Sequence, residues 1–386
     1  MYPMNKTLTV AALLPLLVAA APAPSASPAD TMQVASRDGA NLQRPKWSPD
    51  GKLLSYEANF HDDKRIELYV GSPDPKVVSA IGAPRFTRVL PAVSPSSSLT
   101  AGFSKMGTVG EVAYEISFAP PTIGRFVYSA SNDLQDYDLY ISGGGAITSV
   151  PGADGGPEWS PNGHFIAFTS ARTGEGDLYL IDVNNIGNPP RRLTDMNDSS
   201  ELYITWSPDS TKLAFVGHSH QGDNLWLIPG LGDEPIRLTD WTGSQTRPTF
   251  SPNGRWVAFY ANLENADRMD LYIVEPRQAA TPRMVVKGVV PNAHGPAWTP
   301  DGDHLVTVLD QDDKYDPIAL VEAKQGDDAQ ILDLGTVGNG DLDVVKGADG
   351  RAHLAWVAQG RAKDDKRDFR RLFVATLPPI PPASGD

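Results

Sequence analysis

Short apolar runs alternate with polar segments along most of the chain, and the runs come in groups with the same internal order. Each group opens with an aromatic residue and a polar phrase, then continues with an apolar run rich in β-branched and aromatic side chains. A polar loop and another apolar run follow. The first runs occupy residues 53–56, 165–168, 213–216, 256–259 and 305–308. Short runs of this composition, bounded by turn residues, predict antiparallel β-strands.

The polar phrase reads aromatic, Ser or Thr, Pro, Asp or Asn, and usually Gly. Proline presets the φ of a tight turn, and Asp-Gly or Asn-Gly tolerates the positive φ that follows. The phrase therefore predicts a turn between two strands, with its aromatic packed between neighbouring sheets. We assign this structural role to Trp47, Pro49, Asp50, Gly51, Trp159, Pro161, Gly163, Trp206, Pro208, Pro252, Gly254, Trp298, Pro300 and Gly302.

The phrase recurs with a regular period. Pro161, Pro208, Pro252 and Pro300 are 47, 44 and 48 residues apart. Third strands are expected at 67–70, 138–141, 177–180, 224–227 and 270–273, and fourth strands follow at 192–194 and 237–239. Each repeat therefore predicts a four-stranded antiparallel meander, and this period is typical of β-propeller blades.

The turn phrase, the third strand Asp177-Leu178-Tyr179-Leu180 and the fourth strand Arg192-Leu193-Thr194 resemble the PD40 repeats of the TolB-like propeller superfamily. The resemblance covers nearly everything after residue 31 and implies an all-β propeller. It leaves the function open, because this repeat serves many unrelated roles. In TolB an α/β domain precedes the propeller; we expect no such domain here, so partner contacts made through it do not carry over.

The fourth strands give the expected number of blades. We place them at 77–79, 146–148, 192–194, 237–239, 283–286 and 331–334, with a seventh at 33–36 before the first turn. The last repeat has no fourth strand of its own, so the N-terminal strand is expected to complete it and to close the ring.

Two turn-like phrases at 93–95 and 118–120 break the period, and we interpret them as one enlarged blade with an extra hairpin. This interpretation predicts seven blades. Eight blades, one of them incomplete, and six, the usual number among the nearest relatives, are the alternatives.

The N-terminus has the pattern of an export signal. Lys6 precedes an apolar run at 8–18 that is too short to span a bilayer, and small residues follow it. We expect a signal peptide at 1–20, a flexible Pro/Ala/Ser tether at 21–30, the propeller at 31–377 and a Pro-rich disordered tail at 378–386. An uncleaved disordered N-terminus is the alternative. The expected location is periplasmic or secreted.

The amino-acid composition limits the classes of molecule that this protein is expected to bind. The formal net charge is −14, which disfavours nucleic acid and anionic membrane surfaces. The absence of cysteine excludes disulfides and a lipid anchor on cysteine. No further apolar run is long enough to span a membrane. We expect a monomer with a protein or peptide partner.

Four histidines fall in loops expected on one face of the propeller. His218 and His220 have an i, i+2 spacing, which points both rings to one side of an extended segment. We take them as candidate metal ligands, and His61 and His294 as candidate binding residues. The alternative is that all four are solvated loop residues. No cofactor is predicted, although these histidines and the acidic loops around them leave a divalent metal, Ca²⁺ or a transition metal, open.

Trp241 lies outside the repeat pattern, in a loop between a fourth and a first strand. It is a candidate anchor for a partner, or else it covers the edge of a blade. The chain has no G-x-S-x-G, P-loop or dinucleotide-binding motif, so no catalytic residue is assigned.

The sequence therefore favours an exported, non-enzymatic binding scaffold of the bacterial envelope. The alternative is a metal-assisted polysaccharide lyase or hydrolase with its site at the mouth of the central channel.

Overall fold

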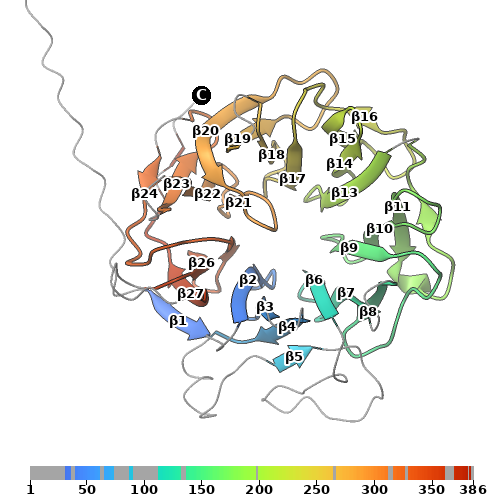
Figure 1. Cartoon of the computed structure of the whole chain (residues 1–386), viewed down its shortest axis with the longest axis horizontal. Coiled ribbons are helices and arrows are strands. Elements are labelled where there is room, and N and C mark those ends of the chain that lie inside the picture. Colours follow the sequence, from blue (N-terminus) through green and yellow to red (C-terminus); the bar gives the residue numbers. More distant parts are fainter. Residues whose placement is uncertain are drawn as a thin grey trace, which may run out of the picture.

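The computed structural model describes residues 31–35, 40–60, 65–73, 87–89, 112–131, 136–196, 199–263, 267–311, 316–326, 329–360, 369–380 and 382–383. These residues form an all-β structure in which a single 3₁₀ turn, Val183–Asn185, is helical. Figure 1 shows the sheets arranged around a common centre, with the first strand of a sheet towards the centre and the last strand outside. This is the expected arrangement of a β-propeller.

The first two sheets each run outwards as antiparallel meanders. Their strands are β2 (Ala40–Trp47), β3 (Leu54–Phe60), β4 (Arg65–Gly71) and β5 (Thr87–Val89), then β6 (Val112–Phe118), β7 (Phe126–Ser131) and β8 (Asp138–Ile141). The outer strand of the first sheet is β5, while the strand expected at 77–79 lies outside the described residues. The expected extra hairpin falls largely on residues 90–111, which also lie outside them.

The next two sheets have four strands each, in chain order. They contain β9 (Asp154–Trp159), β10 (Phe165–Ser170), β11 (Asp177–Asp182) and β12 (Arg191–Arg192), then β13 (Ser199–Trp206), β14 (Leu213–Ser219), β15 (Gly222–Ile228) and β16 (Ile236–Arg237). Both confirm the four-stranded meander that the repeats predict.

Two further meanders are joined into one eight-stranded sheet, because the long strand β20 pairs with β19 and also with β22. The strands are β17 (Gln245–Phe250), β18 (Val257–Ala261), β19 (Met269–Val274), β20 (Arg283–Val290), β21 (Ala297–Trp298), β22 (His304–Leu309), β23 (Ile318–Glu322) and β24 (Gln330–Ile331).

The last sheet contains both ends of the described chain. Its order is β25 (Leu342–Lys346), β26 (Ala352–Ala358), β27 (Arg371–Thr376) and β1 (Met32–Ala35). Strand β1 pairs antiparallel with β27, with Met32 opposite Val374. The first strand of the described chain therefore supplies the fourth strand that the last repeat lacks.

The repeated turns have the structure that their residues predict. At the first turn, Ser48 Oγ accepts the N–H of Leu53 at 2.9 Å and donates to Asp50 Oδ1 at 2.7 Å, while Gly51 adopts φ 68°. Equivalent hydroxyl-to-side-chain bonds recur from Ser160, Ser207, Ser251 and Thr299. The turn is a local device, so its sequence is sufficient to specify it.

The core lies between neighbouring sheets. The aromatic residue of each phrase is buried there: Trp47, Trp159, Trp206, Phe250 and Trp298. The first and last sheets share a cluster of this kind, in which Leu42 and Tyr56 pack with Ala355 and Leu372. In the described part of the chain, no helix has the length and apolar character needed to cross a membrane.

Candidate functional site

The innermost strands share a β-bulge near the centre of the ring. The pairing of β2, β6, β9, β13 and β17 shifts register by one residue, and a residue in the left-handed region lies at each shift. These residues are Arg44, Glu115, Gly156, Tyr203 and Arg247, with φ of 50°, 55°, 57°, 56° and 55°. Four of the five carry a side chain in a conformation that costs roughly 1–2 kcal/mol. The fold therefore repeats one strained residue at one level around the centre.

Three of these left-handed residues donate their backbone N–H to a carboxylate of the preceding sheet. Arg44 N donates to Asp341 Oδ2 at 3.0 Å, and Glu115 N donates to Glu57 Oε1 at 3.1 Å. Gly156 N donates to Glu115 Oε2 at 2.7 Å. Charge-assisted bonds of this kind are stronger than neutral ones, so each carboxylate fixes the bulge of its neighbour.

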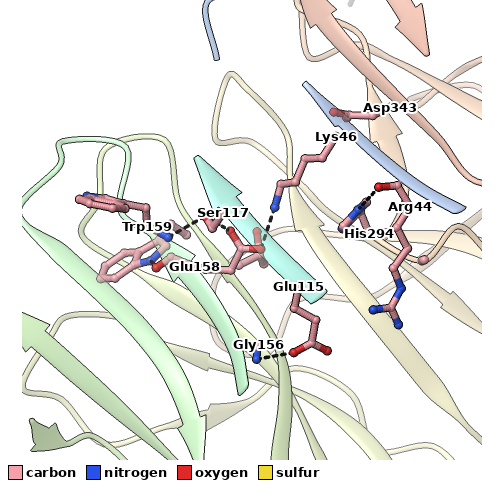
Figure 2. Close-up of polar contacts among 12 residues, drawn as sticks. Arg44, Lys46, Glu115, Ser117, Gly156, Glu158, Trp159, His294 and Asp343 are labelled. Carbon is pink, nitrogen blue, oxygen red and sulfur yellow. Dashed lines mark hydrogen bonds and ion pairs between the residues drawn. The ribbon is translucent and has the colours of Figure 1, made fainter. Parts of the chain in front are cut away.

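A second level of side chains lies two residues further along the same strands. Lys46 Nζ contacts Glu158 Oε1 at 3.0 Å, and Ser117 Oγ donates to Glu158 Oε2 at 3.0 Å (Figure 2). Ser117 Oγ also accepts the N–H of Trp159 at 2.9 Å. On the other side, Asp343 Oδ2 accepts the N–H of Trp47 at 2.7 Å. These contacts connect the first strands of four sheets.

Arg44 is the most heavily paired cation at the centre. Its Nη1 lies 3.5 Å from Glu57 Oε1, and its side chain is mostly buried. Burial by itself lowers the pKa of Arg44, but the carboxylates of Glu57, Glu115 and Asp341 outweigh it and raise the pKa. Arg44 therefore stays charged and holds these carboxylates together.

Two central carboxyl groups bind their protons more tightly than usual. Burial raises the pKa of Glu115, although the N–H of Gly156 opposes this effect. Burial also raises the pKa of Asp343 to about 6, against the N–H of Trp47 and the charge of Lys46. Desolvation is the dominant cause in both cases, because it disfavours the charged form.

His294 is a neutral member of the same centre. Its Nε2 lies 3.2 Å from the carbonyl oxygen of Arg44 (Figure 2). Burial and the charges of Lys46 and Arg44 hold the pKa of His294 well below its ordinary value. A neutral ring that faces a carbonyl with Nε2 must carry its proton there, so His294 acts as a hydrogen-bond donor to β2.

The remaining pair of left-handed residues, on β13 and β17, is more open. Tyr203 is 43% exposed, and the Arg247 guanidinium lies over its ring at 5.2 Å from the centroid. Arg247 Nη1 also donates to the carbonyl of Ala293 at 2.6 Å. This cation–π pair leaves a large aromatic surface accessible near the centre.

The predicted histidines lie in different environments. His218 is exposed on β14 and its Nδ1 contacts Asp223 Oδ1, across the hairpin to β15. His220 is exposed in the same hairpin, and His61 lies outside the described residues. Among the residues that the structure describes, no group of three or more His, Asp and Glu side chains is placed to hold a metal ion.

Trp241 is half-buried and packs against its own chain. Its ring centroid lies 5.2 Å from that of Tyr272 and 5.9 Å from that of Phe259. It packs against a buried cluster that spans β14, β15, β17, β18 and β19. Its role as an anchor for a partner stays a prediction.

The motifs did not identify the residues at the centre, but these residues lie at fixed positions before each turn phrase. Each left-handed residue lies three positions before the aromatic of the turn phrase, and Lys46, Ser117 and Glu158 lie one position before it. These positions vary widely in residue type from repeat to repeat, whereas the turn residues vary only within a narrow set.

Several known proteins are similar to this chain in sequence. No protein-family model matches the chain. The uncharacterized protein Atu1656 of Agrobacterium fabrum is 28% identical over 260 residues, covering 56% of this chain and 84% of that protein. The uncharacterized peptidase YuxL of Bacillus subtilis is 25% identical over 225 residues, covering 44% and 34%. The Tol-Pal system protein TolB of Alcanivorax borkumensis is 32% identical over 106 residues, covering 27% and 24%.

About a quarter of this chain is therefore similar in sequence to a TolB protein. The matched segment spans only about a quarter to a third of TolB and of the peptidase, so the activities of those whole proteins do not follow from it.

Solved structures of other proteins share the fold of most of the chain. An oligogalacturonate lyase in complex with manganese superposes with a TM-score of 0.58 at 13% identity, covering 91% of this chain and 96% of the lyase. A puromycin-hydrolyzing peptidase of Mycobacterium tuberculosis has a TM-score of 0.55 at 15% identity, covering 94% and 57%. Identities this low show the fold alone.

Proposed function

We propose that this TolB-like propeller is an exported, non-enzymatic scaffold that binds a protein or peptide in the bacterial cell envelope. The observation that carries the proposal is the contrast at the centre of the ring. Most polar side chains there are tied to one another and to the backbone of the next sheet, whereas Tyr203 and Arg247 present an accessible aromatic and cationic surface. Rigid scaffolds with a few open groups favour binding, because little ordering entropy is lost.

The envelope location is part of the same proposal. The export signal expected at 1–20 and the likeness to the Tol-Pal system protein TolB support it. The scaffold is expected to act as a monomer.

We also propose that the ring has seven blades and is closed by the N-terminal strand. If the eight-stranded sheet counts as two blades, the described sheets supply seven, and the pairing of β1 with β27 supports closure. The hydrogen bond from Trp47 N to Asp343 also supports closure, because this bond connects the first and last sheets near the centre.

The experiment is affinity capture of envelope proteins with the full chain as bait. We expect one specific partner, and we expect Tyr203→Ala to lower its recovery. Ile331→Ser is the matched control, because Ile331 is equally exposed at 43% but lies on the outer strand β24. Recovery of no envelope protein above background, or equal recovery with both variants, would count against the proposal.

A metal-assisted polysaccharide lyase or hydrolase remains the competing proposal, with His218 and His220 as its ligands. The fold shared with the manganese-bound lyase supports it only at the level of architecture. Metal analysis of the purified protein, with thermal melts before and after EDTA, separates the two. Stoichiometric metal that is lost in a His218→Ala, His220→Ala double variant would favour the enzyme.

A further inference from the structure

The bulges around the centre form a series in which each sheet supplies an anion to the next. The N–H of Arg44 is bound by Asp341, that of Glu115 by Glu57 and that of Gly156 by Glu115. All three donors have nearly the same φ, so the backbone around each N–H group has nearly the same conformation. A backbone N–H in this setting is therefore a carboxylate-binding position, and the protein fills three such positions with its own side chains.

The series is interrupted at Tyr203. Tyr203 has a φ of 56°, which matches the other donors. The left-handed residue of the preceding sheet is Gly156, which has no side chain to reach forward as Glu115 does. A Cβ built on Gly156 would meet no heavy atom within 4 Å, so the space is open. Among the described residues, no side chain accepts the N–H of Tyr203.

Neighbouring acids of the preceding sheet do not substitute for the missing side chain. Glu158, two residues after Gly156, is bound by Lys46 and Ser117 at the next level. Its carboxylate points towards Lys46 and Ser117, on the first strands of the two preceding sheets (Figure 2).

A cation lies next in the ring. The guanidinium of Arg247 stacks against the ring of Tyr203, and one of its N–H groups binds the carbonyl of Ala293. In the described structure Arg247 has no carboxylate within ion-pair distance, whereas Arg44 at the equivalent position of β2 lies 3.5 Å from Glu57. The guanidinium of arginine has five N–H donors in a planar arrangement that suits carboxylates. Most of the N–H donors of Arg247 therefore remain for hydrogen bonds to another group.

We propose that a carboxylate of the bound peptide, from an acidic side chain or a free C-terminus, occupies the open position beside Gly156. It accepts the N–H of Tyr203, and the guanidinium of Arg247 attracts it. The exposed ring of Tyr203 packs against the adjoining part of the peptide. This inference rests on the proposed function and names the chemistry that the scaffold recognises.

The test supplies the missing anion from the protein itself. In Gly156→Glu, the new side chain repeats the arrangement of Glu115, which already accepts a φ of 55°. Gly156→Ala is the matched control, because it carries the same backbone strain but leaves the position open. The probe is acetyl-Ala-Glu-Ala with a free C-terminus, compared with acetyl-Ala-Gln-Ala-amide by ligand-observed NMR.

We expect the charged peptide to bind about tenfold more tightly than the amide, as for a charge-assisted hydrogen bond in place of a neutral one. Gly156→Glu and Arg247→Gln should each weaken it by about tenfold or more, while Gly156→Ala should bind it as the wild type does. Equal affinity for the two peptides, or unchanged binding by folded Gly156→Glu, would overturn the inference. Binding of a galacturonate trimer in preference to the peptide would overturn the assignment to a peptide.

The peptide-binding experiment and the capture experiment can fail independently of each other. If the wild type and Gly156→Glu recover the same envelope partner equally, the carboxylate site fails and the scaffold function stands. If the charged peptide binds as expected but no partner is recovered, the site stands and the envelope function fails.

Discussion

At the scale of single residues, the buried acids set how stability depends on pH. Glu201 on β13 is fully buried and accepts a hydrogen bond from Thr194 Oγ1 at 2.9 Å. Burial raises the pKa of Glu201 from 4.5 to about 7. The folded protein therefore holds this proton more tightly than the unfolded chain. The stability that Glu201 contributes is full below about pH 4.5 and is lost as the pH rises through about 7.

Replacing Glu201 by glutamine should therefore stabilise the protein in alkaline buffer. At pH 8 we expect Glu201→Gln to raise the free energy of unfolding by roughly 1–3 kcal/mol, because the variant avoids burying a charge. The gain should disappear at pH 4. Chemical denaturation at both pH values measures it, with the exposed Glu175→Gln as control. A gain of equal size at both pH values would show that the proton of Glu201 is not its cause.

At the scale of elements, one innermost strand is fixed to the next by side chains at the bulge and two residues beyond it. Ser117 shows the pattern: its hydroxyl donates to Glu158 and accepts the backbone N–H of Trp159, thereby joining β6 to β9. Trp159 is itself packed in the core between these sheets. The alignment of neighbouring sheets therefore depends on polar contacts near the centre as well as on the apolar core.

Removal of the Ser117 hydroxyl should weaken this connection. We expect Ser117→Ala to lower the free energy of unfolding by about 1–3 kcal/mol, because it leaves the N–H of Trp159 buried without its acceptor. Ser200→Ala is the matched control, since the hydroxyl of Ser200 makes only an exposed bond to the carbonyl of Glu175. Urea denaturation compares the two; a loss in Ser117→Ala no larger than in the control would contradict this role.

At the scale of the whole molecule, the two ends of the described chain meet in one sheet. Strand β1 covers the outer edge of β27, and Thr31 Oγ1 donates to the carbonyl of Leu334 at 3.0 Å. The first and last sheets also share an apolar cluster. An exposed strand edge is a template for association, so β1 protects β27 as well as completing its sheet.

Loss of β1 should therefore affect both stability and association. A chain that begins at residue 36 should melt several degrees below a chain that begins at residue 31. It should also form larger species, because the edge of β27 becomes available. Thermal melts and light scattering after size exclusion measure the two effects. Equal melting temperatures and equal masses would show that the pairing of β1 with β27 contributes little.

The sequence predicted the repeated parts of the fold and missed most of the candidate site. The turns from Ser48 to Gly51 and their equivalents were predicted because their signals are local. The strand predicted at 33–36 corresponds to β1, Met32–Ala35, which pairs with β27. The interpretation of His218 and His220 as metal ligands stays a prediction. Arg44, Glu115, Tyr203 and Arg247 were missed because their positions differ in residue type from one repeat to the next.

The sequence by itself determined the period, the turns and the strand order of each repeat, because proline, Asx-Gly and alternating apolar residues act within a few positions of the chain. Only the tertiary structure decided which carboxylate meets which backbone N–H. Arg44 and Asp341 are 297 positions apart and meet because the first and last sheets lie side by side. It also decided that the space beside Gly156 is open, since that depends on the side chains of neighbouring sheets. Residue types encode local conformation, whereas the ring arrangement sets the partners at its centre.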